Sequence, residues 1–246
     1  MGSFFNMDNK FFVFMGRVAD LMILNLLCIV CCIPIVTAGP AIAAMFYVTL
    51  KMVRNEESYI VKGFFKSFRQ NLRQGIIINL IMLLFGILII TDIRIMGNME
   101  GTLYKVLYTI FLAFALVYLM IYMYIYPVLA KFYNSIKNTF INALLMSIRH
   151  LPYTALMIIV TALPFVLFFF VPSSEVQSAV LLVCVLIGCS LVAYINSYFL
   201  VRIFDHYIPE EEEMSEDEKW ENLEAIKVNS DEASTEEAAV AKEDTL

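Results

Sequence analysis

The residues best suited to metal or redox chemistry are five cysteines and two histidines. Cys28, Cys31 and Cys32 are spaced so that one helix would bring their thiols to the same face. Structural zinc takes four Cys or His ligands, however, and His150 and His206 lie at or beyond the ends of the apolar segments. Buried cysteine behaves as a small apolar residue. We therefore expect neither a metal nor another cofactor.

Catalytic patterns are equally scarce. The chain shows no Gly-rich phosphate loop, no pair of carboxylates within an apolar segment and no Ser/His/Asp set. We expect no catalytic residue, no enzymatic activity and no nucleic-acid partner.

Polar residues inside apolar segments are the stronger lead. Asn25, Asn79 and Asn196 lie well inside such segments, where an amide in contact with lipid is costly. Hydrogen bonding between helices is the simplest interpretation.

Tyrosines make a second pattern. Tyr118, Tyr122 and Tyr126 repeat every four residues and would form one helical stripe. A path for a saccharide is one interpretation, because aromatic rings stack on sugars. Helix packing and an interfacial tyrosine belt are the favoured interpretation.

These residues must be positioned by membrane-spanning helices. The chain is 61% hydrophobic with 20 Phe, and its mean hydropathy is +0.77. Long uncharged runs predict an all-α, polytopic membrane helix bundle with about five transmembrane helices and two cytoplasmic amphipathic helices. The expected spans are residues 18–37, 75–95, 104–128, 152–172 and 176–201.

The first uncharged run, residues 21–50, is broken by Pro34, Gly39 and Pro40, so it cannot form one continuous helix. A break of this kind is either a pocket or a turn at the membrane surface. A helix that begins near Arg17 would reach the inner interface near Thr37. We therefore expect a tight turn and candidate hinge, with Gly39 as the cap and Pro40 as the first helical residue.

Charge predicts the orientation. Residues 1–208 hold 14 Lys and Arg, and a five-span arrangement places only Lys10, Arg17, Arg94 and Lys105 on the face opposite the other ten. Basic residues favour the cytoplasmic face. We expect a multi-pass protein of the cell membrane with its N-terminus outside and its C-terminal tail in the cytoplasm.

Two segments on the inner face have amphipathic patterns. In residues 59–73, six apolar residues share one helical face, and a separate basic stripe consists of Lys62, Lys66, Arg69 and Arg73. This pattern is typical of a helix among the anionic headgroups of the bilayer. In residues 131–150, the polar face carries Asn134, Asn138, Asn142 and Arg149. For both helices, lipid contact and docking of a partner remain alternatives.

The last segment, residues 209–246, is acidic, with 3 Lys against 15 Asp and Glu. It has too little apolar surface to offset the cost of ordering it, so we expect a disordered cytoplasmic tail after a membrane domain of residues 1–208. A docking motif around Trp220 is the alternative.

Several motifs together suggest a family. The first block contains Pro34, Thr37, Gly39, Pro40, Ala41, Tyr47, Phe64, Phe65, Phe68 and Asn71. Later blocks are Asn142-Ala143-Leu144-Leu145, Arg149-His150-Leu151-Pro152, Asn196-Ser197-Tyr198 and Arg202-Ile203-Phe204-Asp205. The chain thus resembles the YesL-type membrane proteins of Firmicutes, a domain of unknown function, over about residues 5–208. The acidic tail falls outside the resemblance.

The resemblance implies an association rather than a mechanism, because such proteins are commonly encoded beside carbohydrate ABC permeases and glycan-degrading enzymes. It identifies no catalytic or ligand-binding residue. The leading hypothesis is an accessory or regulatory component of a carbohydrate-uptake system that acts on an ABC permease or a sensor kinase. The alternative is that the protein itself transports a small solute such as a sugar or sugar acid.

Overall fold

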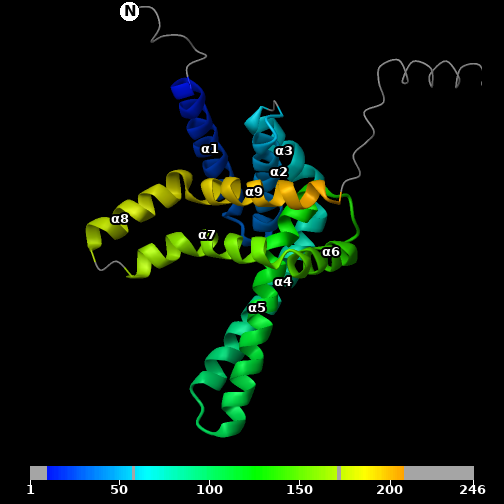
Figure 1. Ribbon diagram of the computed structural model, residues 1–246, viewed down its shortest axis with the longest axis vertical. Helices are drawn as coiled ribbons and strands as arrows, with labels where there is room; N and C mark the ends of the chain where they lie inside the picture. Colours follow the sequence, from blue (N-terminus) through cyan, green and yellow to red (C-terminus); the bar gives the residue numbers. More distant parts are fainter. Residues whose placement is uncertain (1–9, 57–58, 171–172, 208–246) are drawn as a thin grey trace, which may run out of the picture. The chain divides into compact units, whose positions relative to one another are not determined.

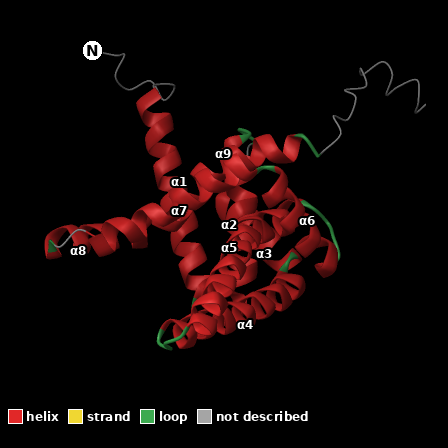
Figure 2. Cartoon of the chain, turned by 60° about the horizontal axis from the view of Figure 1, so that its bottom comes forward, coloured by secondary structure: helices red, strands yellow, loops and turns green. Residues whose placement is uncertain are grey.

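A computed structural model describes residues 10–56, 59–170 and 173–207, and every regular element among them is a helix (Figures 1 and 2). The expected all-α fold is confirmed. A compact unit ends at Phe204, and a second unit begins at Asp205. Nearly all of the second unit, including the acidic tail of residues 209–246, lies outside the described residues.

The described residues of the N-terminal third form four helical elements. Helix α1 (Lys10–Cys32) leads through a 3₁₀ turn, η1 (Ile35–Thr37), into α2 (Ala38–Val53). After Asn55, which has a positive φ of 54°, the chain reverses into α3 (Ile60–Gln70). Asparagine tolerates this left-handed conformation better than most residues.

The remaining helices form two hairpins linked by a shorter helix. One hairpin consists of α4 (Leu72–Gly97) and α5 (Thr102–Lys131), and α6 (Ile136–Arg149) follows it. The other consists of α7 (Leu151–Phe170) and a second arm made of α8 (Ser174–Val183), the π-helix η2 (Cys184–Gly188) and α9 (Cys189–Asp205).

Six described helical segments are long and apolar enough to cross a membrane, one more than the expected five. The additional segment is Ile35–Val53, which comprises η1 and α2. Half of its apolar window is buried within the protein, compared with 11–22% in the other five segments. Helix α2 is therefore a core helix, whereas the others expose apolar surface as lipid-facing helices do.

Two expected boundaries were wrong. Helix α1 ends at Cys32 rather than at residue 37, and Pro34 lies in the non-helical step that follows. Helix α2 begins at Ala38, so Gly39 does not cap it and Pro40 is its third residue. The first turn still tolerates proline, because its amide groups have no partner inside the helix.

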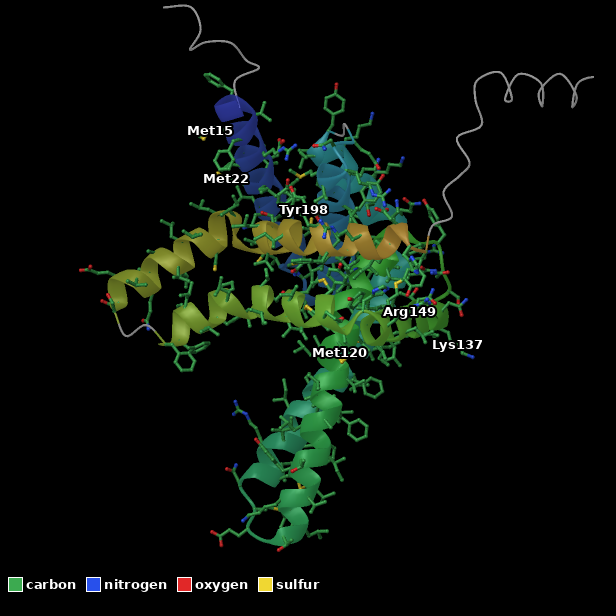
Figure 3. The ribbon with its side chains drawn as sticks, viewed as in Figure 1. Met15, Met22, Met120, Lys137, Arg149 and Tyr198 are labelled. Atoms are coloured by element: carbon green, nitrogen blue, oxygen red, sulfur yellow. The ribbon has the colours of Figure 1, made fainter. Side chains whose placement is uncertain are left out.

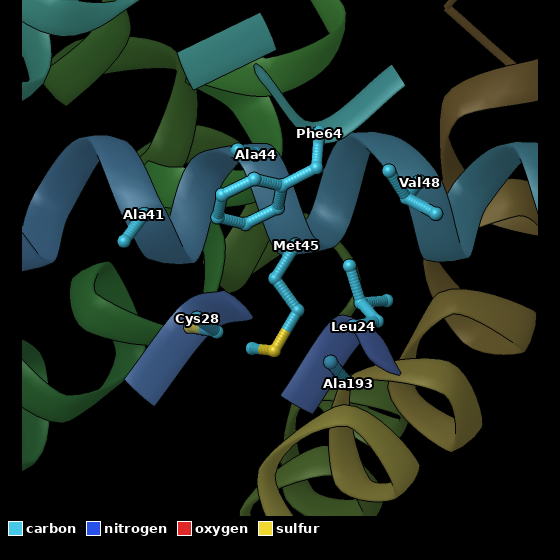
Figure 4. Packing of buried hydrophobic residues seen from close by; sticks show 8 residues of the cluster. All are labelled: Leu24, Cys28, Ala41, Ala44, Met45, Val48, Phe64 and Ala193. Carbon is cyan, nitrogen blue, oxygen red and sulfur yellow. The ribbon is translucent and has the colours of Figure 1, made fainter. Parts of the chain in front are cut away.

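The core of the N-terminal part joins α1, α2 and α3 to α9 (Figure 4). Phe64 of α3 is fully buried in this cluster, and Met45 of α2 lies between Phe64 and the side chains of α1. Small residues on α2 let the neighbouring helices approach closely. The buried members are Leu24, Cys28, Ala41, Ala44, Met45, Val48, Phe64 and Ala193.

Candidate functional site

Thr37 holds two carbonyl groups in the step between α1 and α2, and its backbone amide also donates to one of them, that of Pro34. Its hydroxyl donates to the carbonyl oxygens of Cys31 at 2.8 Å and Pro34 at 2.9 Å. Broken backbone at membrane depth requires such partners. The predicted turn residues Pro34 and Thr37 are thus joined by a direct contact.

A further carbonyl of the turn is held from outside by α4. The Asn79 side-chain amide donates to the Ile35 carbonyl oxygen at 2.8 Å, and the Tyr126 hydroxyl donates to Asn79 Oδ1 at 3.0 Å. Asn79 and Tyr126 are both buried. A hydrogen-bonded chain therefore connects the turn to α4 and α5, and we call these three residues (Ile35, Asn79 and Tyr126) the turn clamp.

The beginning of α2 also packs directly against the backbone of α4. A Cβ added to Gly39 would lie 2.5 Å from the Gly75 carbonyl oxygen and 2.7 Å from the Asn79 Cβ. A Cβ added to Gly75 would lie 2.8 Å from the ring of Pro40. Gly39 is required by this close approach rather than by helix capping. These contacts fasten the turn to α4, and its role as a hinge stays a prediction.

The basic stripe is exposed on the side of α3 away from the core. Lys62, Lys66 and Arg69 lie on α3, whereas Arg73 lies in the first turn of α4, because Asn71 interrupts the expected helix of residues 59–73. The four basic residues keep a regular spacing in the sequence, but they are divided between two helices.

Only part of the predicted apolar face of α3 is buried. Phe64 is fully buried, but Val61 and Phe65 remain 47% and 41% exposed beside the lysines. Tyr59, just before α3, is 84% exposed. Exposed apolar and basic side chains side by side are typical of a helix at a membrane interface or a docking surface.

The polar residues predicted after α5 are only partly brought together. Asn138 and Arg149 are exposed on α6, Asn142 is half-buried, and Asn134 precedes the helix. In Figure 3 the side chains of Lys137 and Arg149 extend away from the ribbon of α6. The buried face of α6 consists of Thr139, Ala143, Met146 and Ser147.

The segment before α6 contacts the beginning of α4. The Gln74 side-chain amide donates to the Asn134 carbonyl oxygen at 3.2 Å, and the Gln70 amide donates to the Tyr133 hydroxyl. The two predicted amphipathic segments therefore meet.

A basic pocket lies where α2 and α5 end. It is a small, open depression, and its charged lining residues are Lys51, Arg54, Lys131 and Glu56. Lys51 pairs with Glu56 at 3.7 Å. Lys51 and Lys131 lie in the last turns of their helices, where cations are favoured by the helix dipole. The sequence did not predict that these four charged residues meet. The only sign of it in the sequence is a lysine at the end of each of the two apolar runs.

The predicted interhelical hydrogen bonds of the asparagines are confirmed. Asn25 donates to the carbonyl oxygen of Val185 at 2.6 Å and accepts from the Ser190 amide at 3.0 Å. Asn25 thus holds the irregular backbone around the π-helix η2. Asn196 donates to the Thr161 hydroxyl at 3.0 Å, and its buried Oδ1 has no hydrogen-bond partner within the described part of the chain.

The tyrosine stripe of α5 is packed against its neighbours. The rings of Tyr118 and Tyr122 stack at 6.3 Å, and those of Tyr122 and Tyr126 meet edge to face at 5.4 Å. The Tyr118 hydroxyl donates to the Met82 carbonyl oxygen at 3.0 Å. Helix packing accounts for these contacts.

The cysteines do not assemble a ligand set in the part of the chain that the structure describes. Cys28 and Cys32 have their sulfurs 3.9 Å apart. No group of three or more His, Cys, Asp or Glu able to hold a metal ion is found among the described residues.

Two contacts of the turn could not be expected from the sequence. Gly75 gave no local sign that it meets the turn, and Tyr126 was expected only as a member of the tyrosine stripe. No local sequence signal identifies such a partner, since the contact is created by the packing of α4 and α5.

Comparison with known proteins adds a family match over the N-terminal part of the chain. No curated protein and no solved structure matches the chain. The matched segment begins within α1, contains the turn and α3, and ends within α4. Residues 21–93 match the family described as "Protein of unknown function, DUF624".

Proposed function

We propose that this multi-pass membrane protein is a non-enzymatic accessory component that binds another membrane protein through the exposed surface of α3. The observation that carries the proposal is the combination on α3 of an exposed basic stripe with exposed Val61 and Phe65. A helix that served only as packing would bury its apolar side chains. Phe64 holds α3 against the core, whereas Val61 and Phe65 remain exposed for contact with a partner.

The partner class follows from the chemistry of this surface and from the resemblance to YesL-type proteins. A basic and aromatic surface suits an acidic, partly apolar surface at the inner face of the cell membrane. The resemblance favours an ABC permease or a sensor kinase of carbohydrate uptake. Anionic lipid headgroups are the competing occupant of the same stripe.

Site-specific cross-linking in native membranes tests this proposal. A photoreactive residue replaces Phe65 of α3, and the control carries it at Leu84 of α4, which is 58% exposed on a lipid-facing helix. We expect the Phe65 position to cross-link to a permease or kinase subunit, identified by mass spectrometry, and the Leu84 position to lipid. Cross-linking of both positions to lipid alone would contradict the proposal.

A charge-removal variant sharpens the test. Lys62→Gln, Lys66→Gln and Arg69→Gln together should abolish the protein cross-link from Phe65. Arg94→Gln with Lys105→Gln, at the turn between α4 and α5, is the matched control and should leave the cross-link unchanged. An unchanged cross-link in the α3 variant would show that the basic stripe does not recognise the partner.

A second candidate function is transport of a small solute such as a sugar or sugar acid. It is favoured by one observation, the buried Asn196 Oδ1 that has no partner among the described residues. Such a group inside a span is a candidate contact for a polar solute. Purified protein in liposomes should then move a labelled sugar or sugar acid, and Asn196→Leu should slow that movement. Absence of flux under every imposed gradient would exclude this function.

A further inference from the structure

The two ends of the α1–α2 hairpin lie next to each other. Arg17, in the first half of α1, donates through Nη2 to Asn55 Oδ1 at 2.6 Å, and Asn55 follows α2. Arg17 also donates through Nη1 to the Tyr194 hydroxyl at 3.1 Å. The hydrocarbon layer is about 30 Å thick, so residues in hydrogen-bond contact cannot lie on opposite faces of it.

The hairpin therefore crosses the membrane an even number of times. Buried Leu24 and Cys28 of α1 pack with Met45 and Val48 of α2, so the two helices run alongside each other for most of their length. Whether both cross or neither does, the residues before α1 and those after α2 share one face. An arrangement in which α1 alone crosses does not satisfy the Arg17 contact.

Other contacts bring the beginning of α4, the segment after α5 and the end of α9 to this face. The Gln74 contact with Asn134 joins the beginning of α4 to the segment after α5. The rings of Phe132 and Phe204 meet edge to face at 5.2 Å, which places the end of α9 beside the end of α5. Lys51 of α2 and Lys131 of α5 line the same pocket as Phe204.

Charge then decides which side this face is on. Of the 14 Lys and Arg in residues 1–208, only Arg94 and Lys105, which flank the turn between α4 and α5, fall on the opposite face. The other twelve fall on the shared face. The basic residues are thus divided twelve to two between the faces, which is more uneven than the ten to four of the five-span arrangement, because Lys10 and Arg17 change sides. Lys and Arg near span ends favour the cytoplasm.

We infer that the N-terminus, α3, the α5–α6 connection and the end of α9 all lie on the cytoplasmic face, and that the turn between α4 and α5 lies outside. This reverses the N-terminal orientation expected from five spans. It also brings the beginning of α1 to the same face as the basic stripe of α3. The inference does not depend on the proposed function, since it concerns the path of the chain and not its partner.

Cysteine labelling of the full chain in intact cells tests this inference. Single cysteines replace Ser3, Tyr59 and Glu100, and a membrane-impermeant maleimide is added before or after permeabilisation. The parent chain gives the background of the native cysteines. Tyr59 and Glu100 are both exposed, so differences in their labelling report the face rather than burial.

We expect Glu100→Cys to be labelled in intact cells, and Ser3→Cys and Tyr59→Cys at least tenfold more after permeabilisation than before it. A green fluorescent protein fused to the N-terminus, which becomes fluorescent only inside the cell, should be as bright as one fused to the C-terminus. Labelling of Ser3→Cys in intact cells, or labelling of Tyr59→Cys and Glu100→Cys from the same side, would overturn the inference.

Discussion

The contact between Gly39 and α4 gives the sharpest test of the structure. In Gly39→Ala the new methyl group would lie 2.5 Å from the Gly75 carbonyl oxygen and 2.7 Å from the Asn79 Cβ. Neither atom belongs to the far end of a flexible side chain, so neither can rotate away. The start of α2 and α4 must separate to accept the group.

Gly16→Ala in α1 is the matched control, because a Cβ there meets nothing within 4 Å. Alanine in place of glycine gains up to about 1 kcal/mol in a helix interior, and overpacking costs about 1–3 kcal/mol. Gly16→Ala carries the first effect, because Gly16 lies in the interior of α1, whereas Gly39 lies in the first turn of α2 and its substitution carries the second. The two variants should therefore differ by about 1–3 kcal/mol, with Gly39→Ala the less stable.

Thermal unfolding of the full chain in lipid nanodiscs measures the difference. For a domain of this size, each kcal/mol shifts the Tm by roughly 2–4 °C. Gly39→Ala should unfold several degrees below Gly16→Ala, and Gly16→Ala should match or exceed the parent. Equal Tm values for the two variants would refute the close approach of α2 and α4.

Four further substitutions test the buried hydrogen bonds. Asn79→Leu removes one of two donors to the Ile35 carbonyl oxygen, the other being the Ala38 amide, and it leaves the buried Tyr126 hydroxyl without its Asn79 acceptor. It should therefore cost about 1–3 kcal/mol in thermal unfolding, whereas Tyr126→Phe should cost less; equal losses would contradict the clamp. Asn25→Leu leaves the backbone around η2 unpaired and should speed hydrogen exchange of that segment; unchanged exchange would show that Asn25 does not hold it. Thr154→Val, which removes the contacts of this hydroxyl with the Tyr124 hydroxyl and with the carbonyl oxygens of Ser147 and His150, should lower the Tm by a few degrees, and an unchanged Tm would show that these contacts add no stability.

Much of the candidate site could be predicted from local pattern. The break after Cys32 follows from the proline and glycine spacing, and the exposed basic stripe follows from helical periodicity. The interruption at Asn71 could not be predicted, because the periodicity of residues 59–73 continues through it. The face of α6 that packs against the protein could not be predicted either, since it includes small polar residues such as Thr139 and Ser147.

The sequence by itself determined that this is an α-helical membrane protein, because its uncharged runs are long enough to cross the hydrocarbon layer as helices, which satisfy their own backbone groups there. It also located the turn and the basic residues, which depend on neighbours in the chain. Tertiary structure decided what the turn contacts and on which face α1 begins. Those features arise where Gly39 meets Gly75, and where Arg17 meets Asn55, and the residues of each pair are brought together only by the folding of helices that lie between them.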